Sequence, residues 1–234
     1  ATEVVQSISG DIDWAQADYD KDGIIDRFLI LHPADPQEDG GGGSDRIWSH
    51  FSQMPEVIET SGGHKINHYV IASMASSTYR GTIMHEMLHQ MGAVDLYPVH
   101  DEVSIGNWKG VGNWDIMASG NWNGQGIWPA LPTAASMELL GVDRFEELTP
   151  SWPQSSGDCY GPNKVLMQMA AGGSALKIEI DMGEYVWVEL RGGSGFDNHL
   201  PGEGVLVLIQ DITSGDISEN EVNSHPDNPW LAVI

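Results

Sequence analysis

The sequence is poor in cysteine and in basic residues, and it contains no long apolar run. Its single cysteine, Cys159, cannot form a disulfide within the chain, and we interpret this thiol as a small buried apolar residue. Ten lysines and arginines stand against 34 aspartates and glutamates, which gives a formal net charge of −24 at pH 7. A surface this acidic repels nucleic-acid phosphates and anionic membranes, so we expect neither as a partner. Because no apolar run approaches the ~18 residues of a membrane helix, we expect no membrane insertion.

The composition is typical of a folded protein. Apolar residues make up 41% of the 234 residues and charged residues 19%, which favours a globular chain over a disordered one. A chain of this length can bury a full core as one large domain or as two small ones. No signal peptide opens it, which indicates either an intracellular protein or one whose targeting and pro-segments have been removed.

Two histidines and a glutamate stand together in the segment HEMLH, residues 85–89, which we expect to lie on a helix that starts near Ser77 or Thr78. Residues four apart on a helix share one face, so His85 and His89 can bind a single metal ion. Glu86 can hold a water whose pKa a zinc ion lowers to about 7. Apolar side chains of the same segment project to the opposite side, and we expect them to be buried (Ile83, Met84, Met87 and Met91).

Gly92 and Asp95 extend this motif. A helix that ends at a glycine can take the left-handed conformation and turn sharply, and the turn can carry Asp95 back toward the metal as a third ligand. The fourth position would stay open for water, as a catalytic zinc site requires. Glu138, on a helix expected over 132–140, is the competing candidate for the third ligand. Met117 lies in a tight turn over 113–120.

An acidic loop near the N-terminus predicts a calcium site. Residues 18–26, DYDKDGIID, place carboxylates at positions 1, 3, 5 and 9 of a loop with glycine at position 6, which resembles the start of a helix-hand calcium loop. Leu29 stands at position 12, where a glutamate is usual, so the loop resembles abbreviated forms that run directly into a strand, here over 24–31. A solvated acidic turn is the alternative. The expected Ca²⁺ ligands are Asp18, Asp20, Asp22, the carbonyl of Ile24, and Asp26.

The pattern of apolar and turn-forming residues changes near Pro150. Apolar runs separated by Gly, Ser and Asp turns predict strands over 165–170, 176–181, 185–191 and 205–209. We therefore expect an α+β protein, with a catalytic domain over 1–150 and an antiparallel β-rich subdomain over 151–234. The last five residues, WLAVI, resemble a strand that is cut short, so we expect this subdomain to be truncated and the chain to be a fragment of a longer protein.

With these residues in view, the chain resembles the immune inhibitor A family of secreted bacterial zinc metallopeptidases. His-Glu-x-x-His-x-x-Gly-x-x-Asp followed by a methionine turn is the metzincin pattern, with aspartate where histidine is commoner. The resemblance implies a metzincin-like catalytic domain, with a mixed sheet and an active-site helix. It implies that His85, His89 and Asp95 bind zinc, that Glu86 is the general base, and that Met117 forms the floor below the metal. The matching stretches are 18–26, 47–50 (IWSH), 85–97, 113–124 and 195–207.

We therefore expect a secreted zinc-dependent endopeptidase that acts on proteins or peptides, made as part of a longer precursor with further domains. Tyr97, His100 and the backbone of the rim loop are candidates for a second electrophile. Two other functions share parts of this pattern: a non-catalytic binding module stabilised by calcium and zinc, and a zinc hydrolase of non-peptide amides. Glu86 argues against the first, because a purely structural zinc site needs no base. Arg191 and Asp197, far from the metal motif in sequence, are interpreted as structural.

Overall fold

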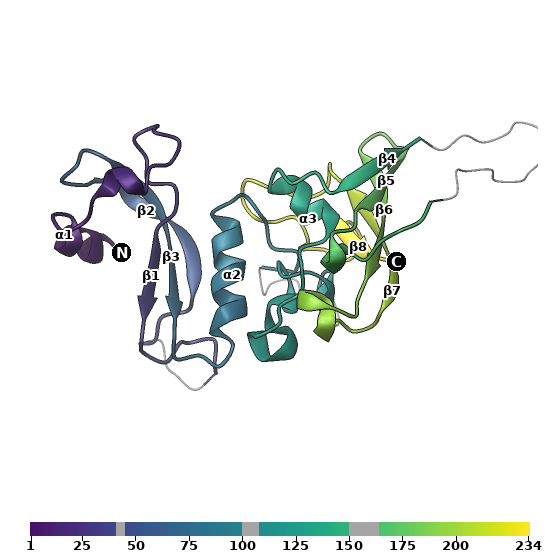
Figure 1. Ribbon diagram of the computed structural model, residues 1–234, viewed down its shortest axis with the longest axis horizontal. Coiled ribbons are helices and arrows are strands. Elements are labelled where there is room, and N and C mark those ends of the chain that lie inside the picture. The colour runs from purple at the N-terminus through teal and green to yellow at the C-terminus, as the bar shows by residue number, and fades with distance from the viewer. Residues whose placement is uncertain (41–44, 100–107, 150–163) are drawn as a thin grey trace, which may run out of the picture. The chain divides into compact units, whose positions relative to one another are not determined.

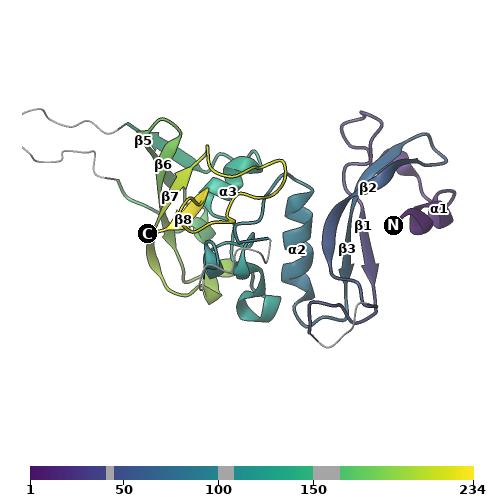
Figure 2. The ribbon, with the colours of Figure 1, turned by 180° about the vertical axis from the view of Figure 1, so that it is seen from behind.

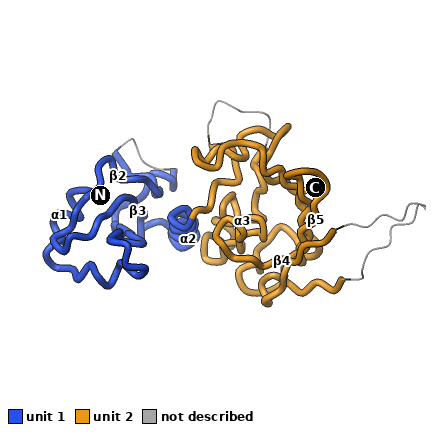
Figure 3. Tube along the Cα trace, turned by 90° about the horizontal axis from the view of Figure 1, so that it is seen from above, with its two compact units in different colours: residues 1–91 blue, residues 92–234 orange. Residues whose placement is uncertain are grey.

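The computed structural model describes residues 1–40, 45–99, 108–149 and 164–234 (Figure 1). These residues form two compact units, residues 1–91 and residues 92–234 (Figure 3). The domain boundary predicted near residue 150 lies outside the described residues, and so do Cys159 and His100. The division into a domain over 1–150 and a subdomain over 151–234 therefore stays a prediction. Among the described residues, no helix combines the length and the apolar character needed to cross a membrane.

The first unit is a small mixed sheet with helices. Its strands lie in the order β1-β3-β2, with β1 parallel and β2 antiparallel to the central β3. The helix α2 packs against β2 and β3, and Figures 1 and 2 show it running beside the sheet. Buried apolar side chains from α1, η1 and the strands form the core, including Val5, Trp14, Phe28 and Ile66. The elements are α1 (Thr2–Ile8), η1 (Trp14–Gln16), β1 (Leu29–His32), β2 (His50–Glu59), β3 (Lys65–Ser73) and α2 (Tyr79–His89).

The strand predicted over 24–31 is shorter than expected. Regular pairing begins only at Leu29, and Ile24 forms an isolated bridge with Lys65. The reason lies in the backbone partners: the N–H of Ile25 donates to the carbonyl of Lys65, whereas the N–H of Asp26 donates to the carbonyl of Ala17. Because Ala17 follows η1 and belongs to no strand, the bond from Asp26 does not extend the sheet, and regular pairing starts only further along the chain.

The second unit contains a five-stranded sheet in the order β4-β5-β6-β7-β8. Strands β5 to β8 pair antiparallel, but β4 pairs parallel with β5, so the sheet as a whole is mixed. Three of the strands lie where the sequence predicted them, at 176–181, 185–191 and 205–209. The strands are β4 (Phe145–Leu148), β5 (Ala175–Asp181), β6 (Glu184–Arg191), β7 (Gly204–Asp211) and β8 (Leu231–Val233).

The prediction of a strand over 165–170 is wrong. This segment ends in a single 3₁₀ turn, η4 (Met169–Ala171), and only Gln168 forms a bridge, with Leu190. The guanidinium of Arg144 donates to the carbonyls of Met169 and Gly173, so it closes the chain into a turn at this point. The apolar run did not predict the structure here, because the side chain of Arg144, distant in sequence, bonds to the Met169 carbonyl that a strand would pair.

Short helices connect the sheet of the second unit to the methionine turn. The helix α3 (Ala134–Leu139) lies within the predicted range of 132–140, and the Thr133 hydroxyl caps it by accepting from the N–H of Ser136. The remaining helical turns are η2 (Gly112–Trp114), η3 (Ser119–Gly126) and η5 (Gly195–His199).

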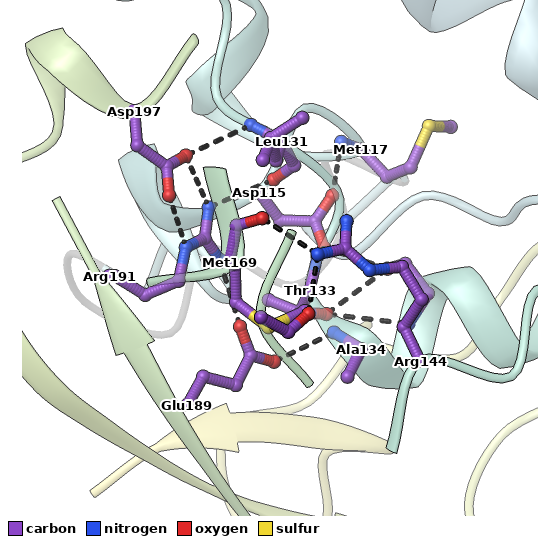
Figure 4. A network of polar contacts seen from close by, with 12 residues as sticks. Asp115, Met117, Leu131, Thr133, Ala134, Arg144, Met169, Glu189, Arg191 and Asp197 are labelled. Carbon is purple, nitrogen blue, oxygen red and sulfur yellow. Dashed lines mark hydrogen bonds and ion pairs between the residues drawn. The ribbon is translucent and has the colours of Figure 1, made fainter. Parts of the chain in front are cut away.

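A buried ion-pair network centres on Arg191 of β6 (Figure 4). The guanidinium donates to both carboxylate oxygens of Asp197, at 2.8 and 2.9 Å, and to Oε2 of Glu189 at 3.2 Å. The other oxygen of Glu189 accepts from the N–H of Ala134 at 2.7 Å. Burial raises the pKa of Glu189, against the opposing effect of the Arg191 charge. The structural role that the sequence suggested for Arg191 and Asp197 agrees with this geometry.

Candidate metal centre

The helix α2 brings the two histidines of the motif together. Their Nε2 atoms lie 3.2 Å apart, and their ring centroids 4.8 Å apart. Asp95 joins them, because one ligand atom from each of the three residues lies within 4.8 Å of the other two. His85 and Asp95 are buried, and His89 is half-buried. The three residues that the sequence predicted as ligands thus form a single group.

Gly92 provides the turn between the helix and Asp95. The helix ends at His89, and Gly92 then takes a φ of +104°, a backbone conformation that side chains with a Cβ rarely adopt. A Cβ at this position would meet only the carbonyl of Leu139, at 3.6 Å, which is an ordinary contact distance. The backbone conformation, and not a lack of space, is therefore what favours glycine here.

Glu86 and His89 share a neighbour in β2. The N–H of Phe51 donates to Oε2 of Glu86 at 2.8 Å, and the Phe51 ring stacks on the His89 ring with centroids 6.1 Å apart. One residue of the sheet thus orients both the predicted base and a predicted ligand. Sequence reasoning missed Phe51, because neither contact involves a polar side chain of that residue.

A buried glutamine holds the same helix on the sheet. The amide of Gln90 donates to the carbonyl of Phe28 and to Nδ1 of His68, both at 3.2 Å. Burial lowers the pKa of His68, which favours the neutral ring that such a hydrogen bond requires. Glu86 of α2 and Gln90, directly after its last residue, therefore both form hydrogen bonds on the side that faces the sheet, whereas Met84 and Met91 are exposed. The prediction that the methionine side of the helix is buried is wrong for these two residues.

The methionine turn is fixed by one buried carboxylate. Asp115 accepts from the N–H of Met117, the N–H of Thr133 and the hydroxyl of Ser136, each at 2.7 Å. Met117 is fully buried, and its carbonyl accepts from the N–H of Leu96 at 2.8 Å. The turn is therefore bonded directly to the residue that follows Asp95.

Glu138, the competing third ligand, is engaged elsewhere. Its carboxylate pairs with Nζ of Lys177 at 2.5 Å. That ammonium also lies 4.4 Å from the centroid of the Tyr185 ring and 5.0 Å from that of Trp187. The group formed with the two histidines contains Asp95 and not Glu138.

Tyr97 and His100 were the side-chain candidates for a second electrophile. Tyr97 lies half-buried two residues after Asp95, whereas His100 lies outside the described residues.

The donor set and its spacing fit a zinc ion. Two nitrogen ligands that lie 2.0–2.1 Å from a tetrahedral zinc are about 3.3 Å apart, close to the 3.2 Å between the two Nε2 atoms. Two imidazoles and one carboxylate also match the three protein ligands that catalytic zinc sites commonly use. His85, His89 and Asp95 would hold the ion.

A second group of possible ligands lies in the acidic loop. Ligand atoms of Asp18, Asp20 and Asp22 lie within 4.8 Å of one another. Asp18 is buried, and its carboxylate accepts from the N–H groups of Asp22 and Gly23. Asp26 instead accepts from the N–H of Tyr19 at 2.6 Å, so it closes the loop and is not part of the group.

Comparison with known proteins places the motif in a family. The model of the immune inhibitor A peptidase M6 catalytic domain matches residues 8–138. An "Immune inhibitor A" from Bacillus thuringiensis subsp. alesti is 32% identical over 108 residues, which cover 42% of this chain and 15% of that protein. A "Pre-pro-metalloprotease PrtV" from Vibrio cholerae serotype O1 is 33% identical over 111 residues, which cover 42% of this chain and 12% of that protein.

The matches to these relatives are partial, since the chain spans less than a sixth of their length. No solved structure matches the chain significantly. The family model, however, covers more than half of the 234 residues and contains the HEMLH segment, Asp95 and Met117. The chain therefore belongs to the immune inhibitor A peptidase M6 family.

Proposed function

We propose that this chain carries the catalytic centre of a secreted zinc endopeptidase with a metzincin-like site. The main support for the proposal is the group formed by His85, His89 and Asp95. Glu86 follows His85 in the sequence, and its carboxylate accepts from the N–H of Phe51. Membership of a peptidase family supports the same reaction. One relative is named a pre-pro-metalloprotease, and both relatives are much longer than this chain. These facts support secretion as part of a longer precursor.

Glu86 has the central role in the proposed mechanism. A zinc ion held by the three ligands would lower the pKa of water to about 7 and stabilise negative charge on the scissile carbonyl oxygen. Glu86 takes a proton as the water oxygen bonds to the carbonyl carbon, and it delivers that proton to the amide nitrogen as the carbon–nitrogen bond breaks. The N–H of Phe51 donates to one carboxylate oxygen of Glu86, and this bond would orient the carboxylate for both transfers.

Removal of the metal tests the proposal. The purified chain is expected to contain about one zinc ion and to cleave an unfolded protein such as casein. Treatment with 1,10-phenanthroline should reduce cleavage to background, and added zinc should restore it. Metal content is measured by mass spectrometry and cleavage by the release of soluble peptides. Bound zinc without cleavage of any protein substrate would overturn the proposal in favour of a binding module. Cleavage confined to small non-peptide amides would favour the other hydrolase.

We further propose that Asp18, Asp20 and Asp22, with the carbonyl of Ile24, bind a structural calcium ion. Bound Ca²⁺ would offset the mutual repulsion of these carboxylates, and at 100 times its dissociation constant it would stabilise the fold by about 2.7 kcal/mol. Calcium added to the zinc-loaded chain is therefore expected to raise the thermal unfolding temperature. The Asp20→Asn variant should lose most of this increase, whereas Asp11→Asn, at an exposed aspartate outside the loop, should keep it. An equal increase in both variants would contradict the assignment.

A further inference from the structure

Asn220 lies in a tight turn between β7 and β8. Two backbone hydrogen bonds close the turn, from the N–H of Asp216 to the carbonyl of Glu221 at 3.3 Å and from the N–H of Glu221 to the carbonyl of Asp216 at 2.9 Å. Asn220 has a φ of +59°, a left-handed conformation that asparagine tolerates better than most residues. The turn therefore presents a half-buried amide side chain from a backbone conformation that few residues adopt.

The amide of Asn220 contacts Asp95 at two points. Its Oδ1 accepts from the N–H of Asp95 at 2.6 Å, and its Nδ2 donates to Oδ2 of Asp95 at 2.7 Å. The chemistry sets the orientation of the amide, because the backbone N–H needs an acceptor and the carboxylate needs a donor. One bond to the backbone and one to the carboxylate of the same residue restrict the side-chain torsions of Asp95.

The backbone around Asp95 is held independently of this contact. Asn223, which is fully buried, donates to the carbonyl of Leu96 at 3.1 Å and to that of Leu231 at 2.8 Å. The N–H of Leu96 bonds to the carbonyl of Met117. Leu96 is therefore fixed by β8 and by the methionine turn without Asn220, so the bond from Nδ2 of Asn220 to the carboxylate acts mainly on the side chain of Asp95.

We infer that Asn220 is a positioning residue for the metal centre, which orients the Asp95 carboxylate and so raises the affinity of the site for zinc. The inference rests on the proposed function in one respect, the assignment of Asp95 as a zinc ligand. Groups that hydrogen-bond to a metal ligand commonly change metal affinity by about 10–100-fold when they are removed. The amide of Asn220 makes one accepted and one donated bond at once, whereas a carboxylate at position 220 could not donate to Asp95 and would repel it.

The test measures the zinc dissociation constant by competition with a chromogenic chelator. The Asn220→Asp variant keeps the size of the side chain, and Asn220→Gly removes it without strain at positive φ. Each is expected to weaken zinc binding by about 10–100-fold. Asn228→Asp is the matched control, because Asn228 is an exposed asparagine of the same connection and the variant adds the same charge; it should bind zinc as the unaltered chain does. Circular dichroism of the metal-free variants checks that they fold.

A double-mutant cycle separates positioning from general destabilisation. In an Asp95→Ala background, Asn220→Gly is expected to cause no further loss of zinc affinity, because the side chain it orients is absent. A loss of zinc affinity of the same size in both backgrounds would overturn the inference. It would also be overturned if Asp95→Ala bound zinc weakly while Asn220→Gly bound it as tightly as the unaltered chain. Unchanged zinc affinity in Asp95→Ala itself would instead overturn the ligand assignment, and the inference with it.

Discussion

Replacement of Glu86 by glutamine is expected to lower kcat for peptide hydrolysis by about 10²–10⁴-fold while zinc stays bound. Glutamine has nearly the same shape, and its amide oxygen can still accept from the N–H of Phe51, so the contact between α2 and β2 is kept. It cannot take a proton from water at neutral pH. The variant therefore removes the proton transfer and leaves His85, His89 and Asp95 in place. Steady-state kinetics with a fluorogenic peptide and the zinc dissociation constant are the two measurements.

Glu138→Gln is the control for this variant. Glu138 is also a glutamate on a helix, but its carboxylate pairs with Lys177, and it lies outside the group of predicted ligands. Its replacement should leave kcat and the zinc dissociation constant within about twofold, because glutamine keeps an acceptor for Lys177 and no predicted zinc ligand is changed. Full activity in Glu86→Gln would exclude Glu86 as the base. Loss of zinc in Glu138→Gln would restore Glu138 as the third ligand.

The part of the site that the sequence predicted is the part that depends on local geometry. The i, i+4 spacing places His85 and His89 on one face of any helix, and Gly92 can adopt a positive φ wherever it occurs. Asp95 follows within three residues, so its position depends on a single turn. Asn220 stands 125 residues further along the chain, and nothing in its neighbourhood marks it as a partner of Asp95. Only the fold reveals that contact.

The errors in the sequence-based fold have a common cause. The apolar side of α2 is expected to be buried, yet Glu86 bonds to the N–H of Phe51 in β2 and Gln90 to the carbonyl of Phe28, directly before β1. The apolar run over 165–170 was expected to be a strand, yet Arg144 takes the carbonyls of Met169 and Gly173. In both places a polar side chain bonds to backbone groups, which a periodicity argument does not take into account. The strands β5, β6 and β7 were predicted well because their partners are their neighbours in sequence.

The second large effect concerns stability. Asp197→Asn is expected to lower the free energy of unfolding of the second unit by about 3–5 kcal/mol, because it leaves the buried guanidinium of Arg191 without its main counter-charge. Arg191 and Asp197 are both almost fully buried. Glu189 cannot fully take over as the counter-charge of Arg191. Burial raises the pKa of Glu189, and its carboxylate accepts only one bond from Arg191, at 3.2 Å. Native-state hydrogen exchange at the amides of β6 and β7 measures the loss within this unit.

Asp181→Asn provides the reference for that measurement. Asp181 lies on the neighbouring strand β5 and is exposed, and its carboxylate accepts from the N–H of Met182, so its replacement should cost no more than about 0.5 kcal/mol. A loss below about 1 kcal/mol in Asp197→Asn would mean that the pair is not the main charge balance of this core.

A loss of the expected size would reach beyond β6, because Asp197 also accepts from the N–H of Leu131 and Glu189 from the N–H of Ala134. Those residues flank Thr133, whose N–H bonds to Asp115. The buried ion pair would thereby support the methionine turn that holds the residue after Asp95.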